Sequence, residues 1–381
     1  MRRLKRRKQR LAQSGLDGPR SPPLSAPDVA TYPADLQGKV ATVQRLIERR
    51  LDEDGLGQGL EVVASPEPLN YRHRVLFDVR HVGDNVEFVV FDQGSAEWVA
   101  VETYPIASMR INRLMAELRS AMIASPELRR KAFQVKLLSN TAGEALACIL
   151  FHRRLSEADL LHAKEAAAVL EASVVLRAKG QRLAWPARRS FLVQENEVGG
   201  KVYPQWLLEN GFFQANIRLN RHMQAWVLAQ TRDGDTERDL LEMYCGNGNF
   251  TLPASRNFRR VLATELDQPA IRGAELCAKT AEVSNVQFCR CRAEKLAFEN
   301  HMQQGRYDFS TLLVDPPRSG LDDRSKEIAQ QFESVLYISC NPRTLVRDLE
   351  GLQGHRIQAA CLFDQFPWTD HAEVALRLTK R

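Results

Sequence analysis

Seven short apolar runs alternate with helical patterns in the second half of the chain, and this alternation constrains the fold more than any other feature. Continuous apolar strands that are separated by helices are typical of a parallel sheet covered on both faces. We therefore predict an α/β domain over residues 189–381, with a mostly parallel seven-stranded sheet. The predicted strands are Asp239–Tyr244, Arg260–Glu265, Val286–Arg290, Thr311–Asp315, Ser334–Ser339, Ile357–Leu362 and Glu373–Leu378.

Residues 33–188 show a different pattern, in which several strands follow one another and helices lie between the groups. This pattern favours a smaller α+β domain, with helices packed on one sheet. Ser156 and Asp159 have the spacing of a capping box, so we expect a helix to begin there. The other predicted elements are helices at Leu36–Leu51 and Ile106–Ile123 and strands at Val75–Arg80, Val86–Phe91, Trp98–Val101, Phe133–Leu138 and Ala145–Phe151.

The first 32 residues form a third region, which we expect to be a disordered basic tail because it cannot bury enough apolar surface to become ordered. Residues 1–20 carry eight Lys/Arg and one Asp, a net charge of +7, so the other 361 residues sum to −1. The tail is either a solvated arm, a grip on RNA phosphates or an address signal. It has no apolar h-region, which argues against a secretory signal.

The composition also limits the location and the cofactors. No apolar run reaches the roughly 18 residues of a membrane span, so we expect no membrane partner. The seven cysteines contain no CxxC pair and no zinc or iron–sulfur spacing, which suits free thiols in a reducing compartment and predicts no metal site. We expect a cytoplasmic protein, with an organelle or the nucleus open because of the basic tail.

A glycine loop follows the first strand of the α/β domain, in the run from Tyr244 to Phe250. Gly246 and Gly248 allow a tight turn and a close approach of backbone to a ligand. The next strand ends in Glu265, at the position where Rossmann-type sites hold a ribose diol. Because no phosphate-binding lysine follows, a nucleoside cofactor without phosphates fits best, and S-adenosylmethionine is the common one. The alternative is an ordinary turn with a surface acid.

Three further positions near strand ends are candidates for chemistry. Cys340 ends the strand that Pro342 terminates, so it lies at the carboxyl edge of the sheet and is a candidate nucleophile. Glu373 begins the last strand beside apolar residues, which can raise the pKa of its carboxyl group and make it a general base. Asp315 opens a rigid Asp-Pro-Pro-Arg loop. Taken singly, each could instead be structural: a buried thiol, a solvated acid and a surface turn.

The first domain interleaves aromatic and basic residues, as in Tyr71-Arg72-His73-Arg74. Arg129-Arg130-Lys131 precede Phe133-Gln134, and Arg153-Arg154 follow the strand that ends at Phe151. Rings that stack on bases and cations that bind phosphates suit single-stranded RNA. The pattern indicates an RNA-binding domain, and scattered surface charge is the alternative for any single cluster.

Four motifs together resemble the RNA uracil-5-methyltransferase family. They are Tyr-Cys-Gly-Asn-Gly-Asn-Phe, Asp-Pro-Pro-Arg-Ser-Gly-Leu, Ile-Ser-Cys-Asn-Pro and Phe-Asp-Gln-Phe-Pro with His-Ala-Glu. Within it, the chain is most similar to the tRNA (uracil-5-)-methyltransferases, which make 5-methyluridine in the T-loop. The resemblance runs from about residue 33 to the end and includes Tyr71-Arg72, Phe91-Asp92-Gln93 and Phe133-Gln134.

The resemblance implies a Rossmann-like class I methyltransferase domain that uses S-adenosyl-L-methionine without a metal. Cys340 would be the nucleophile and Glu373 the proton acceptor. The residues implied to contact the cofactor are Gln214, Tyr244, Asn249, Glu265 and Asp315. The implied partner is the tRNA T-arm, with other T-loop-like RNAs open, and we expect a monomer. An rRNA uracil-5-methyltransferase and a tRNA-folding protein with incidental methylation are the alternatives.

Overall fold

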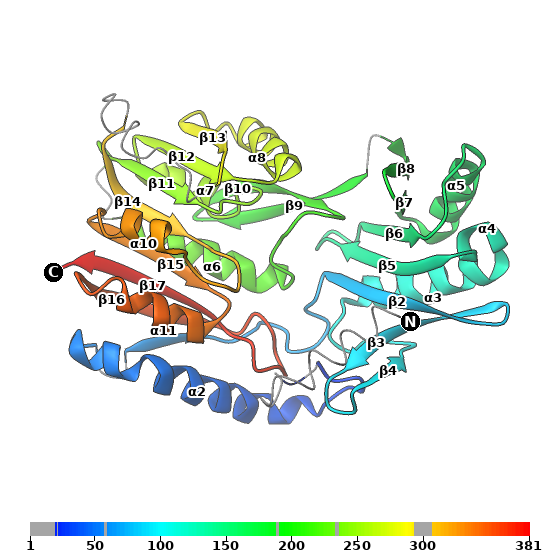
Figure 1. The fold of residues 1–381 in the computed structure, drawn as a ribbon, viewed down its shortest axis with the longest axis horizontal. Helices are drawn as coiled ribbons and strands as arrows, with labels where there is room; N and C mark the ends of the chain where they lie inside the picture. The colour runs from blue at the N-terminus through cyan, green and yellow to red at the C-terminus, as the bar shows by residue number, and fades with distance from the viewer. Residues whose placement is uncertain (1–19, 21, 57–58, 188–189, 233–235, 293–306) are drawn as a thin grey trace.

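The computed structural model describes residues 20, 22–56, 59–187, 190–232, 236–292 and 307–381. Residues 1–19 of the predicted tail lie outside these ranges. Two sheets lie side by side (Figure 1), and each has its own apolar core. None of the helices in the described ranges is long and apolar enough to cross a membrane.

All seven strands predicted for the second half are present in one sheet. Its order is β1-β16-β17-β15-β14-β11-β12-β13, and the four central pairings among β15, β14, β11, β12 and β13 are parallel. Strand β17 is antiparallel to both of its neighbours. The bounds are β11 Asp239–Met243, β12 Arg260–Glu265, β13 Val286–Arg290, β14 Phe309–Val314, β15 Ser334–Ser339, β16 His355–Phe363 and β17 Glu373–Lys380.

Helices cover both faces of this sheet, which explains its uninterrupted apolar strands. Leu312 and Leu313 are neighbours on β14 and both are fully buried, because successive side chains point to opposite faces. Helices α2, α10 and α11 contribute to the core on one face, and α6, α7 and α8 to the core on the other. Their bounds are α2 Tyr32–Glu53, α6 Ile217–Gln230, α7 Thr251–Ala254, α8 Gln268–Thr280, α10 Asp323–Ala329 and α11 Pro342–Glu350.

The sheet has eight strands where seven were predicted. The added strand, β1 (Leu60–Val63), comes from the N-terminal region and pairs in parallel with β16. Helix α2 packs against α11 and β16, so it also belongs in space to this sheet. The predicted division at residue 189 therefore separates most strands of the two sheets but not the first helix and strand. A four-residue edge strand that is half exposed carries too little pattern to be predicted from sequence.

The other sheet has the order β4-β3-β2-β5-β6-β7-β8. Its pairings are antiparallel except β6 with β7, which helix α5 connects. The predicted elements are confirmed with small shifts, and Ser156 does donate to Asp159 at the start of α5. The bounds are β2 Arg74–Val82, β3 Asn85–Asp92, β4 Glu97–Ala100, α3 Met109–Ala124, α4 Pro126–Arg129, β5 Ala132–Ser139, β6 Ala145–Phe151, α5 Ala158–Leu170, β7 Ser173–Ala178 and β8 Gln181–Trp185.

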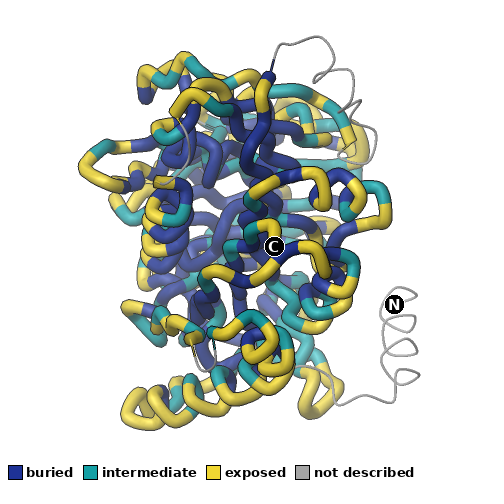
Figure 2. Tube along the Cα trace, turned by 90° about the vertical axis from the view of Figure 1, so that its left-hand side faces the viewer, coloured by how far each residue is buried: buried dark blue, intermediate teal, exposed yellow. Residues whose placement is uncertain are grey.

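A hairpin between the sheets was not predicted. It consists of β9 (Phe191–Val198) and β10 (Lys201–Leu208), and β10 packs on α8. Leu192 and Leu207 of this hairpin belong to a buried cluster that also contains Leu146 and Cys148 of β6. The hairpin therefore contributes to the contact between the two halves, and buried residues continue through the centre of the molecule (Figure 2).

The loop that precedes β17 fastens the two sheets together. Buried Asp364 accepts hydrogen bonds from Tyr32 (2.8 Å) and from Lys39, both on α2. Trp368 belongs to the core of the first domain, and its ring N–H donates to the Pro68 carbonyl at 2.8 Å. Because both ends of this loop are anchored, the entry of the chain into β17 has a defined position.

Candidate active site

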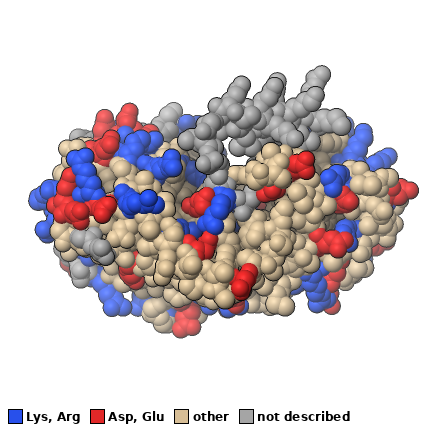
Figure 3. Space-filling view, turned by 90° about the horizontal axis from the view of Figure 1, so that it is seen from below, with Lys and Arg blue, Asp and Glu red and all other residues tan. Residues whose placement is uncertain are grey.

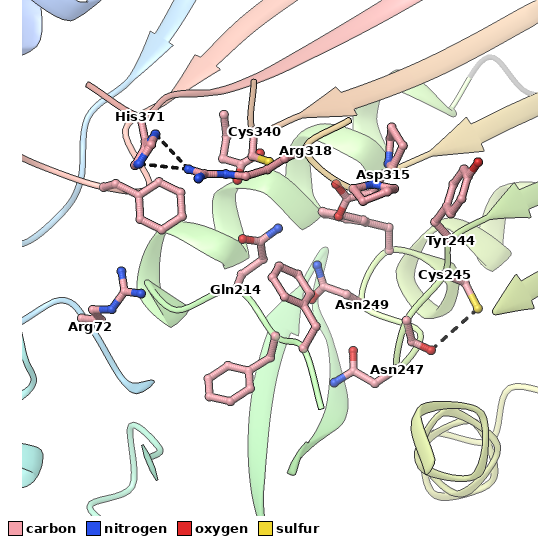
Figure 4. Close-up of a pocket in the computed structure, with 18 of the residues that line it drawn as sticks. Arg72, Gln214, Tyr244, Cys245, Asn247, Asn249, Asp315, Arg318, Cys340 and His371 are labelled. Carbon is pink, nitrogen blue, oxygen red and sulfur yellow. Dashed lines mark hydrogen bonds between the residues drawn. The ribbon is translucent and has the colours of Figure 1, made fainter. Parts of the chain in front are cut away.

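A cavity of about 1080 Å³ lies between the two halves of the molecule. It opens at the carboxyl ends of strands β11, β12, β14 and β15, where ligands of open α/β sheets bind. Figure 4 shows Cys340, Arg318 and His371 grouped at one end and Tyr244, Cys245 and Asn247 at the other. All seven predicted site residues line this cavity: Gln214, Tyr244, Asn249, Glu265, Asp315, Cys340 and Glu373.

The glycine loop has the backbone conformation that its sequence indicated. Gly246 and Gly248 have φ angles of +56° and +80°, in the left-handed region that favours glycine. The Gly246 N–H donates to the Glu265 carboxylate at 3.1 Å. The N–H groups of Leu266 and Asp267 donate to the same carboxylate at 2.6 and 2.8 Å. The Glu265 carboxylate is thus held at the end of β12, with further lone pairs that can accept from a ribose diol.

Asn249 is the centre of an amide network that holds the glycine loop. Its Oδ1 accepts from Gln205 (3.0 Å), Asn220 (2.8 Å) and Gln224 (3.1 Å). Its Nδ2 donates to Asn220 Oδ1 at 3.0 Å. These bonds tie the loop to β10 and α6, so most of the hydrogen-bonding capacity of Asn249 goes to protein partners. Its second amide N–H is what it could offer to a cofactor.

Two other predicted cofactor residues are held by side-chain contacts. Tyr244 follows β11 with φ +64°, and its hydroxyl lies 3.1 Å from Ser325 Oγ. Gln214 is 3% exposed and accepts from Gln365 Nε2 at 3.3 Å. Gln365 Oε1 in turn accepts from the backbone N–H of Asn216 at 3.1 Å. The side chain of Asn216 caps α6. The Phe-Gln pair at 213–214 is therefore positioned by the Phe-Asp-Gln-Phe-Pro motif.

Asp315 lies between the two ends of the cavity. Burial raises the pKa of its carboxyl group to about 7. A cation placed beside it would favour its ionised form. A glycine turn without Cβ atoms, a fixed carboxylate at the end of β12 and an acid that a cation would stabilise together fit a nucleoside cofactor with a positive sulfonium.

Cys340 and Glu373 lie at adjoining ends of two paired strands. Strands β15 and β17 pair antiparallel, with Ser339 opposite Val374. Cys340 directly follows the last residue of β15 and Glu373 is the first residue of β17, so the paired strands place both residues at the same edge of the sheet, where the charge of Glu373 acts on the Cys340 thiol. Two groups 33 residues apart in sequence thus meet at one point of the cavity.

Both groups are in surroundings that disfavour charge. Burial, Glu373 and Asp315 raise the pKa of the Cys340 thiol to about 11, and Arg318 opposes this rise. Glu373 is 2% exposed, and its Oε2 has no hydrogen-bond partner among the residues that the structure describes. Burial and Asp315 raise the pKa of Glu373 well above its usual value, again against Arg318. Cys340 also precedes Asn341, the N-cap of α11, whose dipole favours a thiolate.

Arg318 is a site residue whose role the sequence did not predict. Its Nη2 lies 2.9 Å from both ring nitrogens of His371. Burial and Arg318 lower the pKa of His371 to about 4, so the ring is neutral and can accept an N–H. The Arg318 carbonyl accepts from Asn341 Nδ2 (3.1 Å) and Thr344 Oγ1 (3.4 Å). The Ser-Cys-Asn-Pro segment therefore holds the Arg318 loop in place, with the guanidinium beside Cys340.

The glycine of the Asp-Pro-Pro-Arg-Ser-Gly-Leu motif also has a structural reason. Gly320 has φ +77°, and a Cβ there would overlap the Asp348 carboxylate. Asp348 is buried and accepts from the Leu321 N–H and the Tyr337 hydroxyl, both at 2.7 Å. The motif thus packs its loop against α11 and keeps Arg318 at the cavity.

The first domain supplies the opposite wall. Arg72 lines the cavity, with its guanidinium 5.8 Å from the centre of the Phe366 ring. Leu76 of β2 is 50% exposed there, and Phe212, which follows the β9–β10 hairpin, is 64% exposed beside it, so apolar surface faces the opening. Phe133, predicted to stack a base, lies outside this lining and stacks on His152, with ring centroids 3.8 Å apart and planes 7° apart.

Comparisons with known proteins agree over nearly the whole chain. The family model described as tRNA (Uracil-5-)-methyltransferase matches residues 31–381. A tRNA/tmRNA (uracil-C(5))-methyltransferase of Pseudomonas putida is 37% identical over 93% of this chain and 99% of its own length. The protein of the same name from Yersinia pestis is 40% identical over 84% and 90%.

The fold also resembles a solved structure. The crystal structure of Pyrococcus abyssi tRNA (uracil-54, C5)-methyltransferase in complex with S-adenosyl-L-homocysteine matches with a TM-score of 0.68 and 19% identity. The match covers 91% of this chain and 83% of that one. At this identity the likeness concerns the fold, and it spans both halves of the molecule.

Proposed function

The chain belongs to the tRNA (uracil-5-)-methyltransferase family, and from this premise we propose that it methylates C5 of uridine 54, which opens the tRNA T-loop. S-adenosylmethionine is the methyl donor, and Cys340 forms a transient covalent bond to C6 of the uracil. The observation that carries the proposal is that Cys340 and Glu373, at adjoining ends of the paired strands β15 and β17, both line the cavity.

The proposed reaction needs one nucleophile and one base. C5 of uracil is too weak a nucleophile to attack a methyl sulfonium directly. When Cys340 Sγ bonds to C6, the ring becomes an enolate and C5 gains carbanion character. The bound cofactor supplies the electrophilic methyl group that C5 takes.

Elimination completes the turnover. Glu373 removes the C5 proton, the electron pair of that C–H bond restores the C5=C6 double bond, and the Sγ–C6 bond breaks. A carboxylate in apolar surroundings holds a proton more tightly than an exposed one, so the burial of Glu373 suits proton abstraction from carbon. Arg318 is the cation that favours the ionised forms of both Cys340 and Glu373.

Each predicted cofactor residue contacts a different part of the bound S-adenosylmethionine in this proposal. We propose that Glu265 accepts from the ribose hydroxyls, and that the Gly246–Gly248 turn lets the backbone approach the nucleoside. Asp315 would lie near the sulfonium, and Gln214, Tyr244 and Asn249 would complete the wall.

The RNA half of the proposal rests on the first domain. A uridine must leave its stack to reach Cys340, which costs a few kcal/mol. The stacked rings of Phe133 on β5 and His152, which follows β6, offer a surface on which a displaced base can stack, and Phe212 outside the first domain offers another at the cavity. Stacking on an aromatic side chain contributes roughly 1–3 kcal/mol per base, which offsets much of that cost.

Labelled S-adenosylmethionine and an unmodified T-arm hairpin test this function. After digestion to nucleosides we expect label in 5-methyluridine, and none in a control hairpin whose first T-loop uridine is cytidine. An inert hairpin together with a methylated 23S rRNA fragment would replace the tRNA assignment by the rRNA alternative. Equal labelling of both hairpins would overturn the choice of position 54.

The folding alternative needs a separate measurement. A Cys340→Ser variant that still accelerates the folding of tRNA would show a second role that does not depend on methylation. The monomeric state and the cytoplasmic location stay predictions, which light scattering and fractionation of cells can check.

A further inference from the structure

The chain that precedes α2 lies outside the family match, yet it reaches the catalytic cavity. The match begins at residue 31, whereas Arg20 and Pro22 line the cavity with Thr369 and His371. A guanidinium from this N-terminal segment therefore stands at the mouth of the proposed active site, close to a loop that is some 350 residues away in sequence.

Arg20 is held at the mouth by two carboxylates. Its backbone N–H and its Nε donate to the two oxygens of Asp370, at 2.8 and 2.7 Å. Its Nη1 donates to Asp35 Oδ1 at 2.7 Å. Asp370 belongs to the loop before β17 and Asp35 to the first turn of α2, so Arg20 bridges two elements that frame the opening.

This arrangement leaves Arg20 able to take another anion. Its side chain is 54% exposed and that of Asp370 is 49% exposed, so water and salt screen the pair and it adds little stability. The Nη2 of Arg20 has no hydrogen-bond partner within the described part of the chain. A guanidinium is a fork that binds a phosphate as well as a carboxylate.

The described residues between Arg20 and α2 are packed on the first domain at Leu24 and ordered by a cap at Asp28. Leu24 packs against the core of the first domain. Asp28 Oδ1 accepts from the Ala30 N–H at 3.0 Å and caps a short 3-10 helix, η1 (Val29–Thr31). Residues 1–19 carry seven Lys/Arg and one Asp.

We propose that Arg20 binds a backbone phosphate of the RNA strand that enters the cavity. The rest of the chain sums to −1, and Lys/Arg and Asp/Glu side chains are interspersed on the face in Figure 3. The tail is thus the concentrated source of positive charge, and phosphate contacts dominate affinity for nucleic acid. The inference rests on the proposed function for its ligand, an RNA.

An arginine-to-alanine pair tests the position of this charge. R20A removes the cation at the mouth, and R49A is its control because Arg49, on α2, is 92% exposed and pairs with Glu53 at 2.8 Å. Binding of the T-arm hairpin is measured by fluorescence anisotropy over a range of salt. For R20A we expect about three- to tenfold weaker binding. We also expect a log K against log salt slope that is shallower by roughly 0.7–0.9.

Three further variants separate the contributions. R20K keeps the charge without the fork and should recover part of the affinity. Deletion of residues 1–19 keeps Arg20 and should flatten the salt slope by more than R20A does, since it removes seven cations. R20A in the truncated chain should weaken binding further. All variants should bind S-adenosylmethionine like the parent chain, which also confirms that they are folded.

The outcomes distinguish this inference from the proposed function. If R20A and R49A have the same affinity and slope while the hairpin is methylated, the Arg20 site is wrong and the reaction stands. If R20A alone weakens RNA binding while no 5-methyluridine forms, the Arg20 site stands and the reaction is wrong.

Discussion

The two walls of the cavity differ in burial and in charge. The catalytic wall presents Cys340, Glu373 and Asp315, whose pKa values are all raised by burial. The first-domain wall presents Arg72 and the half-exposed Leu76. Groups that must change protonation during a reaction benefit from a desolvated site, whereas phosphate binding needs permanent charge within reach of solvent. The comparison predicts that changes in one wall affect turnover and changes in the other affect RNA affinity.

The largest effect is expected for Cys340→Ala. Loss of the nucleophile should reduce turnover below detection, because the proposed reaction begins with addition of Cys340 Sγ to C6. The affinity for S-adenosylmethionine and for RNA should stay near that of the parent chain, since the glycine loop, Glu265 and the first-domain wall are intact. Turnover assays report the catalytic step, and equilibrium binding reports the affinities for cofactor and RNA. Full activity would refute the covalent mechanism, and a large loss of RNA affinity would contradict the division between the walls.

Glu373→Gln should stop the reaction at a later step than Cys340→Ala does, after the methyl group has been transferred. The amide keeps the shape of the side chain but cannot accept the C5 proton, so methyl transfer proceeds and elimination stalls. We expect a protein–RNA adduct that survives denaturing electrophoresis and carries the labelled methyl group. The double variant with Cys340→Ala is the control and should give no adduct. Slow ordinary turnover without an adduct would show that another group takes the proton.

Turnover and RNA affinity should respond differently to pH: turnover should rise by up to about tenfold per pH unit, and RNA affinity should not change. Burial, Glu373 and Asp315 raise the pKa of Cys340 to about 11. Below that pKa, the thiolate fraction increases tenfold for each unit by which the pH is raised. Turnover on saturating RNA should therefore increase between about pH 6 and 8, while RNA affinity stays constant because arginine remains ionised. A flat turnover profile would mean that the thiolate is already formed in the complex with RNA and cofactor.

Alkylation of Cys340 sharpens the same prediction. The rate of reaction with iodoacetamide reports the thiolate, and the other cysteines are subtracted with the Cys340→Ala variant. The positive sulfonium of S-adenosylmethionine should lower the pKa of Cys340 and speed alkylation, whereas S-adenosylhomocysteine, similar in shape but without that charge, should not. Equal rates with both ligands would place the sulfonium away from the thiol.

The smallest of these effects is expected in the first domain. Phe133→Ala removes the ring that stacks on His152 and should weaken RNA binding or slow turnover by about tenfold, the equivalent of one lost base stack. Phe133→Tyr keeps the ring and is the matched control. S-adenosylmethionine binding should be unchanged in both. Wild-type RNA affinity together with wild-type turnover in the alanine variant would remove Phe133 from the RNA surface.

The sequence by itself determined the local elements and the chemical groups. Apolar runs between helices specified the strands of the catalytic sheet, Gly246 and Gly248 marked a turn, and Pro342 ended a strand beside Cys340. All of these depend on residues a few positions apart, so they can be predicted from spacing and backbone preference. The motifs then identified which side chains would gather at one edge of the sheet, and all of them line the cavity.

Only the tertiary structure decided which groups meet. The insertion of β17 antiparallel beside β15 places Glu373, its first residue, next to the end of β15 that Cys340 follows, and β1 joins the edge of a sheet that begins almost 180 residues later. Arg318 faces His371 and Arg20 reaches Asp370 through pairings of the same kind. Such contacts depend on strand order, register and packing between distant segments. A sequence encodes these through the summed burial of many side chains and not through any short pattern.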